Sequence, residues 1–210
     1  MHGRLPGPPP GPDPFAGGLP VLDGVPHGGH PPRLRLRPTR ADDAEDVYAV
    51  FSDLETVRYW SHEPFTGLDQ ARDYLAGIER VFGERTLFQW AVADAETDRL
   101  VGTVTLFGWD RAHRRAEVGF ILHRARWGQG LASEAVRAAL AFAFGPMGLH
   151  RVEADVDPDN GASLALLRRI GFREEGRLRE RWFTYGEWRG SVLLGLLSGE
   201  ESSPEAVTRR

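Results

Sequence analysis

The stretch from Arg126 to Ala132 is the part of the sequence best suited to bind a charged ligand. It carries two glycines, Gly128 and Gly130, between a predicted strand and a predicted helix. The first N–H groups of a helix have no partner within it, and the helix dipole attracts negative charge to that end. Glycine also lets a ligand approach the backbone without a Cβ in the way. The pattern predicts a phosphate-binding loop, with a plain tight turn between strand and helix as the alternative.

Two common phosphate-binding patterns do not fit this loop. It lacks the Gly-Lys ending of a P-loop, and its spacing and the acids that follow do not match the dinucleotide-binding fingerprint. A different phosphate-containing ligand is therefore indicated.

The composition excludes several kinds of chemistry. The chain has no cysteine and no lysine, which excludes a thiolate nucleophile, a disulfide, a cysteine metal site and a Schiff base. The histidines show no close metal-ligand spacing, so we expect no metal site. No serine lies in a nucleophile elbow, and we expect no covalent acyl-enzyme. The formal charge of -4 gives no basic field of the kind that accompanies nucleic-acid binding, so we expect no direct nucleic-acid partner.

The elements that must position the loop follow from the hydrophobic pattern. Strict alternation in Arg33-Leu34-Arg35-Leu36-Arg37 predicts an edge strand with its arginines facing water, and Thr39 is the predicted N-cap of the first helix. Glu117 lies on the strand face opposite the apolar set of its strand. The predicted strands cover residues 33–37, 88–92, 100–107, 116–122 and 152–156, a strand starting at 172, and 192–197. The predicted helices cover residues 39–52, 69–82, 131–144 and 160–170, the last capped by Asn160 and closed by Gly171. This order predicts an α/β protein with a mixed sheet.

One folded domain is expected between two tails. Residues 1–32 are rich in Pro and Gly and are predicted to form a flexible leader, with a partner-binding polyproline segment as the alternative. Residues 33–198 form the domain, and residues 199–210 a frayed tail. No apolar stretch approaches the roughly 20 residues of a membrane span, and no secretory signal is visible. We therefore expect a cytoplasmic protein without membrane contact.

Two blocks of the sequence resemble a known family. Trp127-Gly128-Gln129-Gly130-Leu131-Ala132 is similar to the pyrophosphate-binding motif of the GNAT acetyltransferases, with Trp127 in place of the usual Arg or Gln. That tryptophan is typical of the ribosomal-protein N-acetyltransferase (RimJ/RimL) branch. Residues 160–163 and 167–176 resemble the Asn-any-any-Ser helix and the Gly-Phe strand of the same branch. The resemblance covers about residues 33–197, but the aspartate that the branch often has before its last strand is absent from Trp188-Arg189-Gly190-Ser191.

The resemblance implies an acetyl-CoA-dependent N-acetyltransferase with the GNAT acyl-CoA N-acyltransferase fold, whose mixed, mostly antiparallel central sheet is flanked by helices. It implies that the pantetheine lies where the Glu117 strand and the Val152 strand splay apart. Backbone N–H groups near Phe120 and Leu122 would then hold the thioester carbonyl. The coenzyme-binding residues expected on this basis are Phe120, Ile121, Leu122, Arg126, Trp127, Gly128, Gln129, Gly130, Leu131, Ala132, Asn160, Ser163 and Arg169. Arg126 and Arg169 could meet the phosphates or simply be solvated.

Three side chains are candidates for proton transfer in such a reaction. Glu117 is the candidate general base, directly or through water, and a surface carboxylate paired with Arg114 or Arg115 is the alternative. Ser163 and Tyr185 are candidates to protonate the leaving thiolate. Ser163 could instead hydrogen-bond back to the helix cap, and Tyr185 could belong to an aromatic wall.

The acceptor implied by the resemblance is a primary amine, either a protein N-terminus or a small molecule. Trp60 and Phe65, together with Glu117, are expected to shape its pocket, whereas Tyr74 falls on the apolar face of its helix and is expected in the core. A homodimer is common in similar proteins. Two other functions stay open: a non-catalytic acyl-CoA-binding or sensor module of the same fold, and an α/β domain whose glycines only turn the chain.

Overall fold

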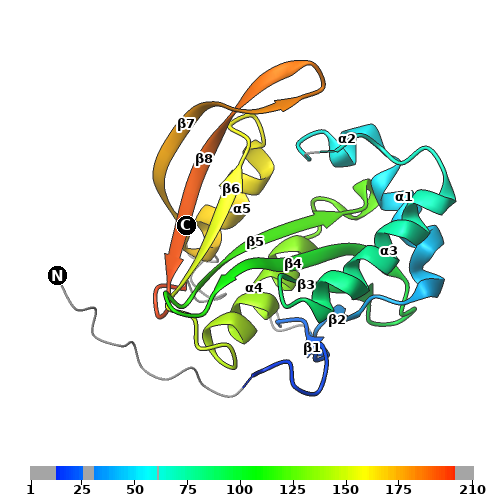
Figure 1. The fold of residues 1–210 in the computed structure, drawn as a ribbon, viewed down its shortest axis with the longest axis horizontal. Coiled ribbons are helices and arrows are strands. Elements are labelled where there is room, and N and C mark those ends of the chain that lie inside the picture. Colours follow the sequence, from blue (N-terminus) through cyan, green and yellow to red (C-terminus); the bar gives the residue numbers. More distant parts are fainter. Residues whose placement is uncertain (1–12, 26–30, 61, 202–210) are drawn as a thin grey trace.

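The computed structural model describes residues 13–25, 31–60 and 62–201, and this part of the chain forms one mixed sheet with helices on both faces (Figure 1). The sheet has eight strands in the order β1-β2-β3-β4-β5-β6-β8-β7. All neighbours are antiparallel except β5 and β6. The strands are β1 (Leu22–Asp23), β2 (Leu34–Pro38), β3 (Leu87–Asp94), β4 (Leu100–Asp110), β5 (Arg115–Leu122), β6 (Arg151–Val156), β7 (Arg173–Thr184) and β8 (Glu187–Leu197). The α-helices are α1 (Ala44–Phe51), α2 (Leu54–Val57), α3 (Leu68–Gly83), α4 (Leu131–Phe144) and α5 (Gly161–Ile170), with short 3-10 helices at Ala41–Asp43 and Arg124–Arg126. The mixed, mostly antiparallel sheet confirms the predicted fold class.

Each face of the sheet has its own core because side chains alternate along the strands. On β5, Ala116, Val118 and Leu122 join the larger core beneath α4 and α5. Ile121 points the other way and packs in the smaller core with α1 and α3. This is the alternation that the sequence predicts for the strand.

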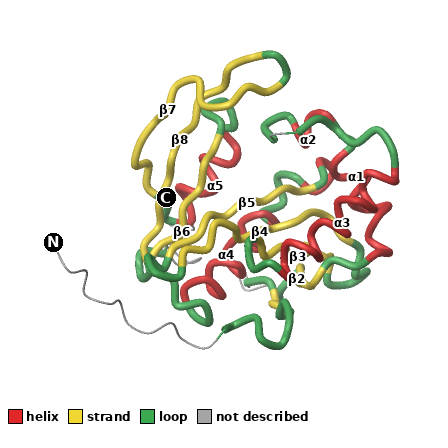
Figure 2. The backbone as a smooth tube through the Cα atoms, viewed as in Figure 1, coloured by secondary structure: helices red, strands yellow, loops and turns green. Residues whose placement is uncertain are grey.

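The sheet opens between β5 and β6. These parallel strands pair only over Arg115 to Glu117 and Arg151 to Glu153, and beyond that point they diverge (Figure 1). β6 continues along β8, and β7 and β8 extend together as a long hairpin (Figure 2). The predicted splay therefore exists. One side of it is formed by β5, which pairs with β4, and the other side by β6, which pairs with β8.

Part of the predicted flexible leader is packed against the domain, so that prediction is wrong for residues 13–25. Phe15 is 1% exposed and stacks on Phe88, with ring centroids 3.9 Å apart. The indole N–H of Trp90 donates to the carbonyl of Pro20 at 2.8 Å, and β1 pairs with β2. These contacts hold in place a segment whose average composition predicts disorder. Residues 1–12 and 26–30 lie outside the described residues, as do residues 202–210 of the predicted tail.

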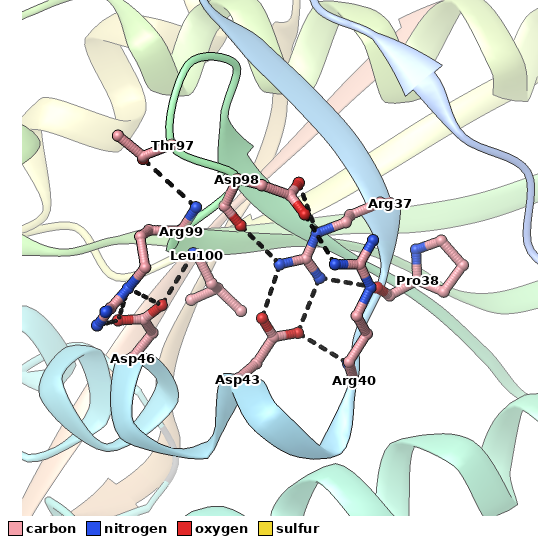
Figure 3. Close-up of polar contacts among 9 residues, drawn as sticks. All are labelled: Arg37, Pro38, Arg40, Asp43, Asp46, Thr97, Asp98, Arg99 and Leu100. Atoms are coloured by element: carbon pink, nitrogen blue, oxygen red, sulfur yellow. Dashed lines mark hydrogen bonds and ion pairs between the residues drawn. The ribbon is translucent and has the colours of Figure 1, made fainter.

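The strand β2 is not the outermost strand, and its last arginine does not face water. Arg37 is 3% exposed and forms an ion pair with Asp43, which lies just before α1 (Figure 3). Asp98, in the turn between β3 and β4, accepts from both Arg37 and Arg40. Beside this cluster, Asp46 of α1 binds the guanidinium of Arg99 and the backbone N–H of Leu100. The alternation of Arg and Leu predicts the strand, but it cannot show that the carboxylates of Asp43 and Asp98 cover one face.

The helix predicted over residues 39–52 starts later and is shorter. Arg40 has an extended backbone, so Thr39 does not cap a helix, and the 3-10 turn Ala41–Asp43 leads into α1. Asp53 then caps the short helix α2 by accepting from the N–H of Thr56 at 3.0 Å. The predicted helices over residues 69–82, 131–144 and 160–170 are confirmed within one or two residues at their ends.

Candidate active site

A cavity of about 820 Å³ lies in the opening between β5 and β6. One wall is the second half of β5, the opposite wall is the end of β6 with α5, and the start of α4 closes one end. Side chains from the β7–β8 hairpin and from the segment after α2 line the other end. Beyond Glu117, the side of β5 that faces the cavity has no paired strand in the described chain. Alternate backbone N–H groups of Val118 to Leu122 therefore point into the cavity, since those between them bond to β4.

The loop before α4 has the geometry of an anion-binding site. Gly128 and Gly130 have φ values of 72° and 76°, in the left-handed region that favours glycine. The first backbone bond of α4 runs from the N–H of Glu134 to the carbonyl of Gly130 at 3.1 Å. In the described residues, the N–H groups from Gly128 to Ser133 have no protein acceptor, and most of these residues line the cavity. These free donors at the positive end of a 14-residue helix fit a diphosphate.

Neighbouring side chains hold this loop in place. The indole N–H of Trp127 donates to the carbonyl of Leu122 at 2.8 Å and so ties the loop to the end of β5. Arg126 forms an ion pair with Asp94, at the end of β3, while it also lines the cavity. Gln129 is not among the residues that line the cavity, and its side-chain amide donates to the carbonyl of Ala125 at 3.1 Å.

A buried carboxylate fastens the loop and α4 to the start of β2. Glu134 is 2% exposed and accepts from the backbone N–H groups of Arg33 and Leu34, at 2.8 and 3.2 Å. The guanidinium of Arg33 pairs with the same carboxylate at 3.1 Å and donates to the carbonyl of Gln129 at 2.9 Å. Neither residue was singled out from the sequence, because a glutamate in a first helical turn is usually a solvated helix-dipole partner.

The opposite wall brings Asn160 and Ser163 into the cavity. The side-chain oxygen of Asn160 accepts from the N–H of Ser163 at 3.1 Å, which confirms Asn160 as the cap of α5. The Ser163 hydroxyl has no hydrogen-bond partner in the described residues and is free to meet a ligand. Arg169, farther along α5, also lines the cavity, so the two ends of this helix face the same space.

Glu117 lies in the cavity on β5 without an ion pair to the arginines proposed as its alternative partners. Arg115 pairs with Glu153 at 3.0 Å and Arg114 donates to the carbonyl of Gly148 at 2.7 Å. Burial, followed by the charges of Glu153 and Asp155, raises the pKa of Glu117 above the ordinary value for a glutamate. The charges of Arg181 and Arg115 only partly offset this effect. A carboxylate with this environment is suited to accept a proton.

Several residues at the other end of the cavity were not anticipated. Asp155 and Asp157, near the end of β6, and Arg181 and Arg189, from the hairpin, all line it. Strand alternation could have found Asp155, because it shares a face with Glu153, which pairs with Glu117. Arg181 had no such signal, since nearly every residue of β7 is exposed and its sequence shows no apolar period. Arg189 precedes the apolar run of β8 and had no such signal either.

The predicted acceptor-pocket residues separate in the structure. Trp60 lines the cavity, together with Thr56 and Tyr59 of the same segment. Phe65 does not: its ring stacks on Phe51 with centroids 5.3 Å apart, in the smaller core. The ring packs between Phe51 of α1 and Tyr74 of α3, because burial in an aromatic cluster is more favourable than a place at a polar cavity. Tyr74 lies in the same core as predicted, where burial raises its pKa to about 12.

Tyr185 does not share the cavity with Ser163. It lies at the turn of the β7–β8 hairpin, is not among the residues that line the cavity, and has a φ of 53°. Its hydroxyl donates to the carbonyls of His62 and Val57, at 3.0 and 3.3 Å. The structure therefore uses this tyrosine to join the hairpin to the segment after α2.

Two further features of the described residues bear on the chemistry. No group of three or more His, Asp or Glu side chains in this part of the chain is arranged to hold a metal ion. Among the helices of residues 13–25, 31–60 and 62–201, none combines the length and apolar character needed to cross a membrane.

Comparisons with known proteins agree on one family. The family described as acetyltransferase (GNAT) domain matches residues 33–173. The chain is 37% identical over 168 residues to the uncharacterized N-acetyltransferase p20 of Bacillus licheniformis, covering 80% of this chain and 94% of that one. Mycobacterium smegmatis RimJ in complex with CoA-disulfide has a TM-score of 0.74 and 25% identity, over 86% of this chain and 88% of that one. Spermidine N-acetyltransferase from Vibrio cholerae in complex with CoA and spermine has a TM-score of 0.71 and 25% identity, over 80% and 97%.

Proposed function

The chain belongs to the GNAT family of N-acetyltransferases, and from that premise we propose that it transfers acetyl from acetyl-CoA directly to a primary amine. The observation that carries the proposal is one continuous cavity with a diphosphate cradle at one end and a carboxylate of raised pKa beside the open strand edge. Binding of the coenzyme alone would need only the cradle. Transfer to an amine also needs a base that accepts a proton from the amine, and the carboxylate supplies it.

The residues present fit acetyl-CoA, which supplies the activated acetyl group when bound. The free N–H groups from Gly128 to Ser133 hold its diphosphate. The cavity-facing N–H groups of the second half of β5 receive the thioester carbonyl and stabilise negative charge that develops on its oxygen. Asn160 offers its side-chain amide to the pantetheine from the opposite wall, and Arg169 adds a positive charge on the same helix.

Two side chains move protons. Glu117 accepts a proton from the attacking amine, because a deprotonated carboxylate with a raised pKa is a stronger base than an ordinary glutamate. Ser163 donates its hydroxyl hydrogen bond toward the leaving sulfur. Its help is modest, since a thiol titrates near about 8.5 and leaves readily without a strong acid.

The acceptor enters from the end formed by Trp60, Tyr59 and the hairpin. Both small amines and peptide N-termini fit an aromatic entrance of this kind. Relatives named for spermidine and for ribosomal proteins make spermidine and N-terminal peptides the first acceptors to test.

Two measurements on the full chain test the proposal. CoA is titrated into labelled protein while the amide resonances from Gly128 to Ser133 are followed, and release of free thiol from acetyl-CoA is measured with spermidine and with short N-terminal peptides. We expect these amides to move and thiol release to depend on the amine. Binding without amine-dependent release would leave an acyl-CoA-binding module, and unmoved amides would overturn both functions.

A further inference from the structure

Asp155 occupies a place in the cavity that the reaction described above does not use. The pairing of β5 with β6 sets Glu117 opposite Glu153, and Asp155 follows two residues later on the same face of β6. Since the strands diverge after this pair, Asp155 lies across the opening from the second half of β5. Both Glu117 and Asp155 line the cavity.

The acids on this face differ in how their charges are balanced. Glu153 is paired with Arg115 at 3.0 Å and with Arg151 at 2.9 Å, and it does not line the cavity. Within the described residues, Asp155 has one ion-pair partner, Arg181, whose Nε lies 3.4 Å from Oδ2 without forming a hydrogen bond. That oxygen is buried and has no hydrogen-bond partner in the described residues. A carboxylate oxygen in this state favours a cationic donor that arrives from the cavity.

The side chains at this end of the cavity carry more negative than positive charge, which favours a cationic ligand. Three carboxylates, from Glu117, Asp155 and Asp157, face two arginines, Arg181 and Arg189. Arg189 is shared with acids outside the lining, because it also pairs with Glu187 at 2.9 Å and with Asp159 at 3.4 Å. The acidic groups are therefore in excess here, next to the aromatic ring of Trp60, which also favours cations. The ring of Trp182 already has the guanidinium of Arg181 over it, 5.4 Å from its centroid.

We propose that Asp155 binds the acceptor as an ammonium ion and presents it to Glu117. This inference rests on the proposed function and names its substrate class: primary alkylamines that are cations at neutral pH, in preference to neutral aromatic amines. In the step itself, one N–H bond of the ammonium breaks and its proton passes to the Glu117 carboxylate. The nitrogen keeps the electron pair and becomes the nucleophile.

The electrostatic surroundings of Glu117 support this division of roles. The charged groups that face it are Glu153 and Asp155 on β6, Arg181 on β7 and Arg115 on its own strand. Both acids raise its pKa and both arginines lower it. Removing either acid thus lowers the pKa of Glu117, but only removal of Asp155 also removes the site for the ammonium. Glu153 therefore provides a matched control.

The experiment compares Asp155→Asn with Glu153→Gln, using whichever of spermidine and the N-terminal peptides the wild-type enzyme acetylates best. For Asp155→Asn we expect the acceptor KM to rise about ten- to a hundredfold, since a charge-assisted hydrogen bond is lost. The affinity for CoA is expected to stay within about twofold, because the cradle is unchanged. Glu153→Gln is expected to move the acidic limb of the pH profile to lower pH, as Asp155→Asn does, while its acceptor KM stays near wild type.

Equal acceptor KM values in the two variants would overturn the inference while the proposed function stood. A wild-type preference for aniline over benzylamine would overturn it as well, because aniline is neutral at pH 7. Asp155→Ser serves in place of Asp155→Asn if circular dichroism shows that the asparagine variant does not fold. Failure of the wild-type protein to acetylate any amine is a different result, which overturns the proposed function itself.

Discussion

The guanidinium of Arg37 donates two hydrogen bonds to the carboxylate of Asp43, at 2.8 and 2.7 Å, with both side chains almost fully excluded from solvent. Asp43 also accepts from the backbone N–H of Arg40 at 2.7 Å, so it closes the turn between β2 and α1 (Figure 3). Hydrogen bonding to Asp43 raises the pKa of Arg37 above its ordinary value. The pair thus joins β2 to the start of α1, the helix that packs on the smaller core.

Replacing Asp43 by Ala is expected to destabilise the fold by about 3–5 kcal/mol, because it leaves the buried Arg37 charge without its main partner. Urea unfolding followed by circular dichroism measures this change. The matched control is Asp69→Ala, which removes an exposed pair with Arg72 and is expected to change stability by less than about 1 kcal/mol. Similar losses in the two variants would contradict the assignment of a structural role to the buried pair.

Arg37 also illustrates what the sequence can and cannot predict about this fold. Alternation correctly identified β2 as a strand, because the pattern is a property of neighbouring residues. The carboxylate of Asp98 comes from 61 residues farther along the chain, and that of Asp43, six residues away, reaches Arg37 only because the chain turns back after β2. Phe15 was missed for the same reason, since its burial depends on a stack with Phe88 and not on its own Pro- and Gly-rich surroundings.

Gly130→Ala is expected to weaken CoA binding at least about fivefold and to lower stability by about 1–2 kcal/mol, because a Cβ is disfavoured at its φ of 76°. A change in the backbone angles that relieves this strain would also turn the N–H groups at the start of α4 away from the diphosphate. Calorimetric titration with CoA and thermal unfolding measure the two effects. Gly77→Ala is the control: a Cβ there meets nothing within 4 Å in the middle of α3, so stability is expected to rise by about 0.5–1 kcal/mol with CoA affinity unchanged. Unaltered CoA binding by Gly130→Ala would argue against the loop as the cradle.

Ser163→Ala and Tyr185→Phe are expected to separate the two candidate proton donors. Ser163→Ala should lower kcat by up to about tenfold, a modest effect because the thiol is a good leaving group. Tyr185→Phe should leave kcat within about twofold and lower stability by about 1 kcal/mol, since its hydroxyl bonds to the carbonyls of His62 and Val57. Burial and the charge of Glu63 also raise the pKa of Tyr185, which makes it a weaker acid. A large loss of kcat in Tyr185→Phe with normal stability would reverse the two assignments.

The site was predictable from the sequence where a motif is local. Gly128, Gly130 and the Asn160 cap belong to short segments whose conformation is set by their own residues, and each has the expected geometry. For Tyr185 and Phe65 only the residue type indicates a role in the site, and in the structure Tyr185 bridges two segments while Phe65 packs in the smaller core. Asp155 could have been inferred from its spacing to Glu153, but Arg181 reaches the cavity from β7, an exposed strand that joins the sheet beyond β8.

Glu117→Gln is expected to lower turnover by at least about a hundredfold with the best acceptor, because the amide cannot accept the proton. In the wild-type enzyme kcat/KM should fall as pH decreases through the raised pKa of Glu117, and this acidic limb should be absent from the variant. Glu79→Gln, an exposed change on α3 outside the cavity, provides the control and should retain the wild-type profile. A loss of less than tenfold in Glu117→Gln would exclude this residue as the general base.

The same substitution is expected to stabilise the protein at neutral pH. Because burial and the neighbouring acids raise the pKa of Glu117 in the folded state, the folded chain binds its proton more tightly than the unfolded chain does. The contribution of Glu117 to stability therefore falls as pH rises from the ordinary glutamate value of 4.5 through the raised value, and the loss is complete above it. Glu117→Gln has no such loss, so its melting temperature should exceed that of the wild type at pH 7 and approach it below pH 4.5. A variant that is less stable at pH 7 would mean that the carboxylate has a stabilising partner in the folded protein. The pKa of Glu117 would then not be raised, and the argument for this residue as the general base would fail.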